Sequence, residues 1–369
     1  MMAIIKNFFI SVHLFFFRFC EFWRLIKNPV YYKSKSYFPE YKCLKSTLRV
    51  FWEQTWNILY YGDINEFYFL YGFDIKNFRC FREYVDNGVF IRRRNILNRE
   101  DLVKPICVLR DKFLFGIFAD ALGIATPQNI GVIKNNKIYL LKEKKEKDLR
   151  EYLVNNELDV FIKNSNGECG NGVFAFKSVS GHLYINNISS TIEDVLNYIS
   201  TDVSYIVQSR INQHHQISHI YNKSINTIRL ETILNPITKR IEIFPPLLRV
   251  GTGNNTVDNW AMGGLAIGID LESCCLKEYG FYKPSFGTKV TVHPDSKVVF
   301  KNYRIPYLRE AIEMAIKLHR HLDKIHSIGW DIAITEDGPC FIEGNDNWEI
   351  SLVQICSQGL GIKFKELFN

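Results

Sequence analysis

The sequence predicts a mixed α+β fold preceded by a helical amino-terminal region. Residues 329–347 alternate apolar and polar side chains, turn at an Asp-Gly pair and continue in a second apolar run, the pattern of a β-hairpin. Two further apolar runs, at 159–163 and 174–177, flank a glycine-rich loop, whereas the first 120 residues follow a helical, aromatic pattern. At 369 residues and 47% hydrophobic, the chain can form two or three domains.

The amino terminus has the pattern of an aromatic helix. Its apolar residues fall on one helical stripe: Ile5, Phe8, Phe9, Val12, Phe15, Phe16, Phe19, Phe22, Trp23 and Ile26. The uncharged run from Asn7 to Phe17 is shorter than the roughly 20 residues that span a bilayer. Residues 1–28 therefore form either an in-plane helix with Lys6, Arg18 and Arg24 near lipid headgroups, or a helix packed on the protein's own core or on a partner.

The composition limits the cellular compartment and the classes of partner that we expect. The net charge of +7 is scattered along the chain, which excludes a nucleic-acid footprint but is compatible with an anionic substrate or an acidic membrane surface. Nine cysteines without CxxC spacing indicate reduced thiols. We therefore expect a cytoplasmic protein, with peripheral attachment to the inner membrane as an open alternative.

The pattern of residues 29–125 predicts a helical domain. Only its last helix carries a candidate site residue. We expect its aromatic residues, which include Trp52, Trp56, Tyr60, Phe67 and Phe81, to lie in a core. A helix from Arg110 to Gly123 carries Lys112 in its first turn and is released into a strand at Thr126-Pro127.

Residues 126–207 contain a candidate phosphate-binding loop. The strand at 159–163 ends in Lys163, and the loop that follows holds Gly167, Gly170 and Gly172. A loop with little side-chain bulk and many free backbone N–H groups can fold over phosphates, and a lysine at its mouth adds a point charge. A plain glycine-rich hairpin connection is the alternative. A hairpin at Ser180-Gly181 and a helix beginning near Thr191 follow.

The strand at 205–208 leads into an extended segment that begins the last region, 208–369. Such a segment offers backbone donors and acceptors to a flat heterocycle, and Ile211 adds apolar contact. His214 and His215 follow. If they continue a strand they face opposite sides, so we do not expect them to share a metal ion.

Arginines at otherwise apolar positions predict an anion site. Arg229 follows Ser224-Ile-Asn226-Thr-Ile, and Arg249 precedes Val-Gly251-Thr-Gly253. A buried arginine is tolerated when it meets a carboxylate or a phosphate. A turn at 258–264 then offers closure over a substrate, and the helix from Tyr307 to about Ile325 is expected to pack in the core.

The hairpin at 329–347 ends in hard oxygen ligands. The turn brings Asp331 beside Glu343, and Glu343 and Asn345 point to the same side of their strand. Two carboxylates and a carboxamide suit Mg²⁺, which leaves its other positions to water and phosphate. An ordinary exposed hairpin is the alternative.

In this order the motifs resemble the ATP-grasp superfamily, and most closely its sugar-transfer-associated proteins, which occur with bacterial surface-polysaccharide genes. The resemblance covers roughly Lys104 to Leu360. It implies two α+β lobes that clasp ATP, with one or two Mg²⁺ at Asp331, Glu343 and Asn345. The remaining nucleotide contacts that it implies are Lys112 and Lys163 at the phosphates, the flap of Gly167, Gly170 and Gly172 above them, Gln208, Arg210 and Ile211 at the adenine, and His214 and His215 at the ribose.

The resemblance also implies ATP-driven ligation through an acylphosphate, giving ADP and phosphate. Arg229 and Arg249, with Asn226 in the same motif, would hold the acylphosphate and the incoming carboxylate. The implied partners are a carboxylate-bearing sugar or amino acid, an amine acceptor and a glycosyltransferase, in capsule or O-antigen synthesis. A kinase of a sugar or lipid-linked sugar, and a catalytically idle nucleotide-binding scaffold, remain alternatives.

Overall fold

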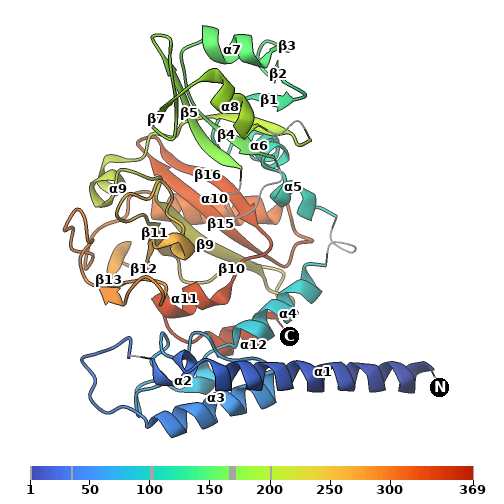
Figure 1. The fold of residues 1–369 in the computed structure, drawn as a ribbon, viewed down its shortest axis with the longest axis vertical. Helices are drawn as coiled ribbons and strands as arrows, with labels where there is room; N and C mark the ends of the chain where they lie inside the picture. The colour runs from blue at the N-terminus through green and yellow to red at the C-terminus, as the bar shows by residue number, and fades with distance from the viewer. Residues whose placement is uncertain (1, 35, 100–103, 166–171, 200–201, 369) are drawn as a thin grey trace.

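Two antiparallel sheets form the body of the protein (Figure 1). The computed structural model describes residues 2–34, 36–99, 104–165, 172–199 and 202–368. Within them each sheet has eight strands, and helices cover the sheets and form the amino-terminal region. The α+β class and the helical amino terminus predicted from the sequence are confirmed.

The first sheet holds the strand that ends in Lys163. Its strands are β1 (Asn129–Lys134), β2 (Lys137–Leu140), β3 (Lys145–Asp148), β4 (Leu158–Asn164), β5 (Val173–Val179), β6 (His182–Ile185), β7 (Ile188–Ser190) and β8 (Tyr205–Ser209), in the order β3-β2-β1-β8-β4-β5-β6-β7. On β4, Val160 and Ile162 are buried in the core that α7 (Leu149–Asn155) and α8 (Ile192–Tyr198) complete. Because side chains alternate along a strand, Lys163 points away from that core.

The second sheet holds the predicted hairpin near its edge. Its strands are β9 (Thr227–Leu234), β10 (Ile241–Ile243), β11 (Leu247–Val250), β12 (Leu265–Asp270), β13 (Cys275–Phe281), β14 (Lys289–Val290), β15 (Ser327–Thr335) and β16 (Gly338–Asn345). The order is β14-β13-β12-β11-β9-β15-β16, with β10 paired to β9. β15 therefore lies between β9 and β16 and is buried along nearly its whole length.

Helices cover both faces of the second sheet. On one face, Ile228 and Leu230 of β9 share a core with α10 (Leu308–Arg320) and with α6 (Lys112–Ala121), which follows α5 (Ile106–Arg110). On the other face, Leu247 and Ala266 pack with α11 (Ile350–Cys356), α12 (Gly361–Phe368) and the amino-terminal region. The helix expected at 307–325 is thus confirmed as a core helix, although α10 ends at Arg320.

The amino-terminal region is helical and docks onto the second sheet. It contains α1 (Met2–Lys27), α2 (Val30–Lys33), α3 (Thr47–Tyr61), the 3-10 turn η1 (Phe81–Glu83) and α4 (Asn87–Leu97). Fully buried Gln354 of α11 joins the two parts, because its side chain accepts from Val85 N–H and donates to the Val85 carbonyl and the Tyr71 hydroxyl. None of the described helices is long and apolar enough to cross a membrane.

The expectation that the aromatic residues of 29–125 lie in a core is wrong for α3. Trp52, Trp56 and Tyr60 are 61%, 67% and 68% exposed. The side of α3 that faces the protein buries Val50 and Ile58 together with Gln54 and Asn57, whose amides bond to backbone carbonyls. The other two aromatic residues of the set, Phe67 and Phe81, pack against the core as expected.

Candidate functional site

The β15–β16 hairpin brings the predicted oxygen ligands together. In its register Asp331 pairs with Glu343 and Gly329 pairs with Asn345, as the alternation and the turn predicted. The chain turns at Glu336-Asp337, and Gly338 follows with a φ of 122°, a conformation that favours glycine. A register shift after Asp331 marks a bulge at the start of the site.

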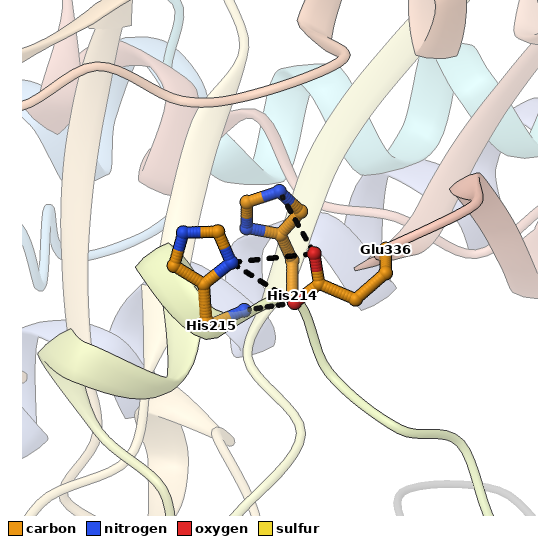
Figure 2. Close-up of side chains that lie close together, drawn as sticks. All are labelled: His214, His215 and Glu336. Carbon is orange, nitrogen blue, oxygen red and sulfur yellow. Dashed lines mark hydrogen bonds and ion pairs between the residues drawn. The ribbon is translucent and has the colours of Figure 1, made fainter.

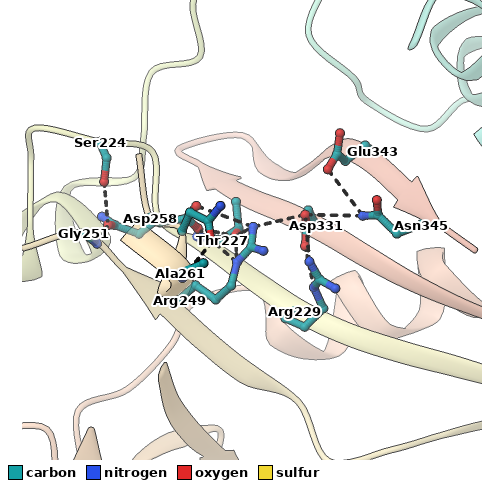
Figure 3. Close-up of polar contacts among 12 residues, drawn as sticks. Ser224, Thr227, Arg229, Arg249, Gly251, Asp258, Ala261, Asp331, Glu343 and Asn345 are labelled. Atoms are coloured by element: carbon teal, nitrogen blue, oxygen red, sulfur yellow. Dashed lines mark hydrogen bonds and ion pairs between the residues drawn. The ribbon is translucent and has the colours of Figure 1, made fainter. Parts of the chain in front are cut away.

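Asp331 is held by two arginines from the neighbouring strands (Figure 3). Arg229 donates from Nε to Oδ1 at 2.7 Å and from Nη2 to Oδ2 at 3.2 Å, and Arg249 Nη2 lies 3.1 Å from Oδ2. Burial alone would raise the pKa of Asp331, but the two guanidinium groups outweigh it and hold that pKa below its ordinary value. Asp331 is therefore an ionised, buried carboxylate.

Arg249 is fixed on its other side by Thr227 and by Asp258, which was expected in a turn that closes over a substrate but is buried against Arg249 instead. Its Nε and Nη2 donate to the Thr227 hydroxyl at 3.1 and 2.9 Å, and Nε lies 3.4 Å from the Asp258 carboxylate. Asp258 in turn accepts from the Thr227 N–H and hydroxyl (Figure 3). Two carboxylates thus hold one guanidinium in place.

Asn226 lies beneath this network and is 1% exposed. Its Oδ1 accepts from Gly251 N–H and the Ser224 hydroxyl, and its Nδ2 donates to the Tyr221 carbonyl and to Gln213 Oε1. The amide is fully used inside the protein, so its geometry fits a residue that positions the Arg249 strand and not one that touches substrate.

Lys112 and Lys163 approach Glu343 from the other side of the site. Asp111 caps α6 by accepting from Phe113 N–H, which places Lys112 at the first helical position with its Nζ 3.9 Å from Glu343 Oε2. Burial, opposed by Glu343 and reinforced by Lys112, lowers the pKa of Lys163 to about 8. Lys112 thus approaches Glu343 directly, and Lys163 lies near enough for the charges of both to act on it.

Glu343 and Asn345 can face a Mg²⁺ ion, whereas both oxygens of Asp331, the third predicted ligand, already meet Arg229 and Arg249. Asn345 Nδ2 lies 3.4 Å from Glu343 Oε1 and 3.5 Å from Asp331 Oδ2. Amide O and N positions are exchanged by a rotation of the side chain, which would turn Asn345 Oδ1 toward a cation. Burial, and after it the charge of Asp331, raises the pKa of Glu343, so a cation here would relieve the repulsion between the carboxylates.

The hinge residues are less open to a ligand than predicted. Gln208 is 3% exposed and donates to Asn129 Oδ1 at 2.9 Å, so its side chain is committed to the first sheet. Arg210 pairs with Asp159 at 3.2 Å, and Ile211 is half-buried. The predicted flap residues Gly167 and Gly170 lie outside the described residues, whereas Gly172 adopts a φ of 70° as β5 begins.

His214 and His215 do not continue a strand, so the reason for expecting them to face opposite ways is wrong. His214 caps α9 (His215–Ile220), and the two rings stack with centroids 4.3 Å apart (Figure 2). Glu336 of the hairpin turn lies 3.5 Å from His214 Nε2 and 3.0 Å from His215 Nδ1. The three side chains have the composition of a metal site.

The hydrogen bonds favour a clamp over a metal site at these histidines. His214 Nδ1 accepts from Gln216 N–H at 3.1 Å, so a neutral His214 carries its proton on Nε2 and donates it toward Glu336. A metal-bound histidine usually donates its other N–H, and here that nitrogen faces a donor. Glu336 therefore ties the hinge to the hairpin, as do the His214 N–H and the Ile334 carbonyl at 2.8 Å.

Glu231 is a buried acid that the sequence reasoning passed over. It is 1% exposed on β9, two residues after Arg229, and burial raises its pKa to about 8. Among the described residues its Oε2 has no hydrogen-bond partner. The signal was an acidic residue in an otherwise apolar strand, which is tolerated when the group holds its proton.

Because Asp331 is paired with two arginines, we expect its substitution to lower the stability of the protein strongly. Asp331→Asn should lower the free energy of unfolding by about 3 kcal/mol, because it leaves two buried guanidinium groups without their shared counter-ion. Asp337→Asn, at the exposed turn of the same hairpin, is the matched control and should change stability by less than about 0.5 kcal/mol. Urea denaturation measures both. Equal stability of the two variants would show that the arginines find other partners.

Comparison with known proteins places the chain in a family. The model of the sugar-transfer associated ATP-grasp family matches residues 93–366. No curated protein is detectably similar to the chain.

Several solved structures share parts of this fold. D-alanine-D-alanine ligase from Helicobacter pylori matches at 14% identity and a TM-score of 0.40, over 70% of this chain and 57% of that one. VanG D-Ala:D-Ser ligase from Enterococcus faecalis matches at 14% identity and a TM-score of 0.39, over 72% of this chain and 61% of that one. The ADP complex of N5-carboxyaminoimidazole ribonucleotide synthetase matches at 11% identity and a TM-score of 0.40, over 66% of this chain and 46% of that one.

This chain spans less than two thirds of each of those three structures. The family match, in contrast, covers about three quarters of the chain, including both sheets and every site residue described above. The chain belongs to the sugar-transfer associated ATP-grasp family.

Proposed function

We propose that the protein is an ATP- and Mg²⁺-dependent carboxylate–amine ligase that modifies a sugar acid or amino sugar during surface-polysaccharide synthesis. The observation that carries this proposal is the approach of Lys112 to within 3.9 Å of Glu343, with Lys163 close enough to feel the charges of both. Two cations facing a carboxylate and a carboxamide match what a triphosphate and its magnesium need. Family membership supports the nucleotide and the polysaccharide setting.

The reaction is an acyl transfer in two steps. A carboxylate oxygen of the acid attacks the γ-phosphorus of ATP, the bond to the bridging oxygen breaks, and ADP leaves with an acylphosphate formed. The amine nitrogen then attacks the acyl carbon, the carbon–oxygen bond to phosphate breaks, and the amine proton passes to solvent. Mg²⁺, held by Glu343 and Asn345 beside Asp331, would neutralise charge on the phosphates.

The residues of the chain act by binding and orienting. Lys112 and Lys163 would hold the phosphate oxygens from the side of the first sheet. Arg229 and Arg249 each use Nε and Nη2 on Asp331 or its neighbours, and within the described residues their Nη1 groups make no hydrogen bond or ion pair. We propose that these N–H groups bind the acid substrate and that Asn226 positions them.

The hinge would hold the nucleoside by its backbone. The side chains of Gln208 and Arg210 are committed to Asn129 and Asp159, so the main chain that follows β8, with Ile211, would receive a flat ring. The Glu336 clamp on His214 and His215 would fix this segment against the hairpin that carries the metal ligands. Nucleotide and metal would thus be positioned by one connected unit.

A screen for ADP and phosphate release tests the proposal. Purified protein is given ATP, Mg²⁺ and pairs of sugar acids and amines. A ligase releases ADP and phosphate only when an acid and an amine are both present, a kinase releases ADP with a phosphorylated product, and an idle scaffold releases neither. Glu343→Gln should lower turnover by roughly a hundredfold or more and leave the fold intact, because Glu343 lies at the rim of the site.

Glu366→Gln, on the exposed surface of α12, is the matched control for that substitution and should retain full turnover. Full turnover of Glu343→Gln would refute the metal assignment. Loss of turnover in both variants would point to a general effect of removing negative charge and would count against the site.

The lowered pKa of Lys163 leads us to expect that ATP binding depends on pH. Its pKa of about 8 means that the ammonium form predominates at pH 7 and is lost as the pH rises through 8. Bound phosphates favour the charged form and raise this pKa, so affinity for ATP should be highest below pH 8 and weaken above it. Isothermal titration from pH 6.5 to 9.5 measures the profile. Lys163→Met should bind weakly with no step near pH 8, whereas an unchanged step would assign it to another group.

A further inference from the structure

Helix α3 buries polar side chains on the side that faces the protein and exposes a stripe of large apolar side chains to solvent. Leu48, Trp52, Trp56 and Tyr60 recur every four residues and are 61–68% exposed, which makes one stripe along the whole helix. The opposite side buries Gln54 and Asn57 together with Val50 and Ile58. Surface helices of globular proteins normally keep their exposed side polar, so this exposed stripe suits an apolar neighbour.

The inward polar residues fix this orientation of α3. Gln54 accepts from Asn65 N–H at 3.1 Å and donates to the carbonyls of Asn65 and Tyr31 at 3.0 and 3.1 Å. Asn57 donates to the Asp63 carbonyl at 2.8 Å and to Asp86 Oδ2 at 3.2 Å. Rotating the helix to bury its tryptophans would break all these bonds and leave buried polar groups unpaired.

Helix α1 packs beside α3 and adds a second exposed aromatic stripe. Leu25 and Ile58 share a small core, and the rings of Phe22 and Phe51 meet edge to face at 6.3 Å. On the outer side of α1, Phe16, Phe19 and Trp23 are 61%, 57% and 51% exposed. Figure 1 shows both helices at the end of the molecule opposite β2 and β3, with α1 extending beyond the body toward the amino terminus.

The charges on the two helices favour an anionic surface. Each helix carries one acidic residue: Glu21 is paired with Arg24 at 3.3 Å, and Glu53 with Lys45 at 2.7 Å and Arg49 at 3.0 Å. Exposed Lys27 lies 5.3 Å from the Trp23 ring, at the end of the stripe. Aromatic side chains edged by lysine and arginine are the composition of helices that lie in a lipid headgroup region.

We propose that α1 and α3 together form a membrane-binding face that inserts Trp52, Trp56 and Tyr60 among the headgroups of an anionic bilayer. α3 supplies the fixed part of this face, because its orientation is set by hydrogen bonds to the rest of the protein. The proposal stands independently of the ligase chemistry. Figure 1 shows α1 and α3 at the end of the molecule away from the first sheet, so the nucleotide site proposed between the sheets would lie at a distance from the bilayer.

Vesicle flotation of the full-length protein tests this face. The wild type should float with vesicles of phosphatidylcholine and phosphatidylglycerol and bind phosphatidylcholine alone more weakly. The triple variant Trp52→Ser, Trp56→Ser, Tyr60→Ser should lose roughly tenfold or more in vesicle affinity, because it removes three aromatic side chains from the interface. Its circular dichroism and melting temperature should stay close to wild type, since all three side chains are exposed.

The matched control removes three exposed apolar residues elsewhere. Ile188, Ile237 and Ile362 are 71%, 84% and 75% exposed, and changing all three to Ser should leave vesicle affinity unchanged. Equal loss in both triple variants, or wild-type binding by the α3 variant, would overturn the proposal. So would a lipid-free dimer, seen by sedimentation, that the α3 substitutions dissociate while wild-type protein ignores vesicles, because the face would then be occupied by a second copy of the chain.

Discussion

The ion pairs between Asp331 and two arginines are the constraint on which the site depends. Asp331, Arg229 and Arg249 stand on β15, β9 and β11, so one carboxylate joins three strands in the middle of a sheet. Buried charges are tolerated only when they are paired, and here the pairing also fixes where the hairpin presents its other oxygens. Because β15 pairs with β16 in a fixed register, the position of Asp331 also determines where Glu343 and Asn345 lie.

The balance of charge around Glu343 explains why the site suits a triphosphate with its metal. Lys112 and Lys163 face it from one side, and Asp331 faces it from the other. Burial lowers the pKa of Lys163 and raises that of Glu343, and the opposite charges nearby do not fully offset it. Phosphates would relieve the first deficit and Mg²⁺ the second, which is how one ligand pair can satisfy both.

The hairpin and Lys163 could be predicted because their signals are local, whereas the role of Lys112 came from the family resemblance. Alternation around an Asp-Gly turn sets the register of β15 with β16, and an apolar strand followed by a glycine-rich loop places Lys163 near the end of that strand. Arg229 and Arg249 were found for a related reason, since an arginine in an apolar strand requires a partner. Their partner was Asp331, whose identity depends on β9 lying between β11 and β15.

The features that could not be predicted from the sequence depend on tertiary packing. The stacked rings of His214 and His215 follow from a helix that begins at His215 and from Glu336, 121 residues away. The aromatic residues of α3 were expected in a core because aromatic residues usually are buried. Which side of that helix faces inward is decided by the bonds of Gln54 and Asn57 to loops distant in sequence.

The central claim is that the first sheet and the hairpin bind the same triphosphate, and a double-mutant cycle on Mg²⁺-ATP affinity tests it most directly. Lys163→Met and Asn345→Ala are measured singly and together by titration calorimetry. If both side chains act on one bound nucleotide and its metal, their effects should be non-additive by about 0.5–3 kcal/mol. Effects that add to within about 0.3 kcal/mol would mean that the lysine and the carboxamide serve separate sites, and the account would be wrong.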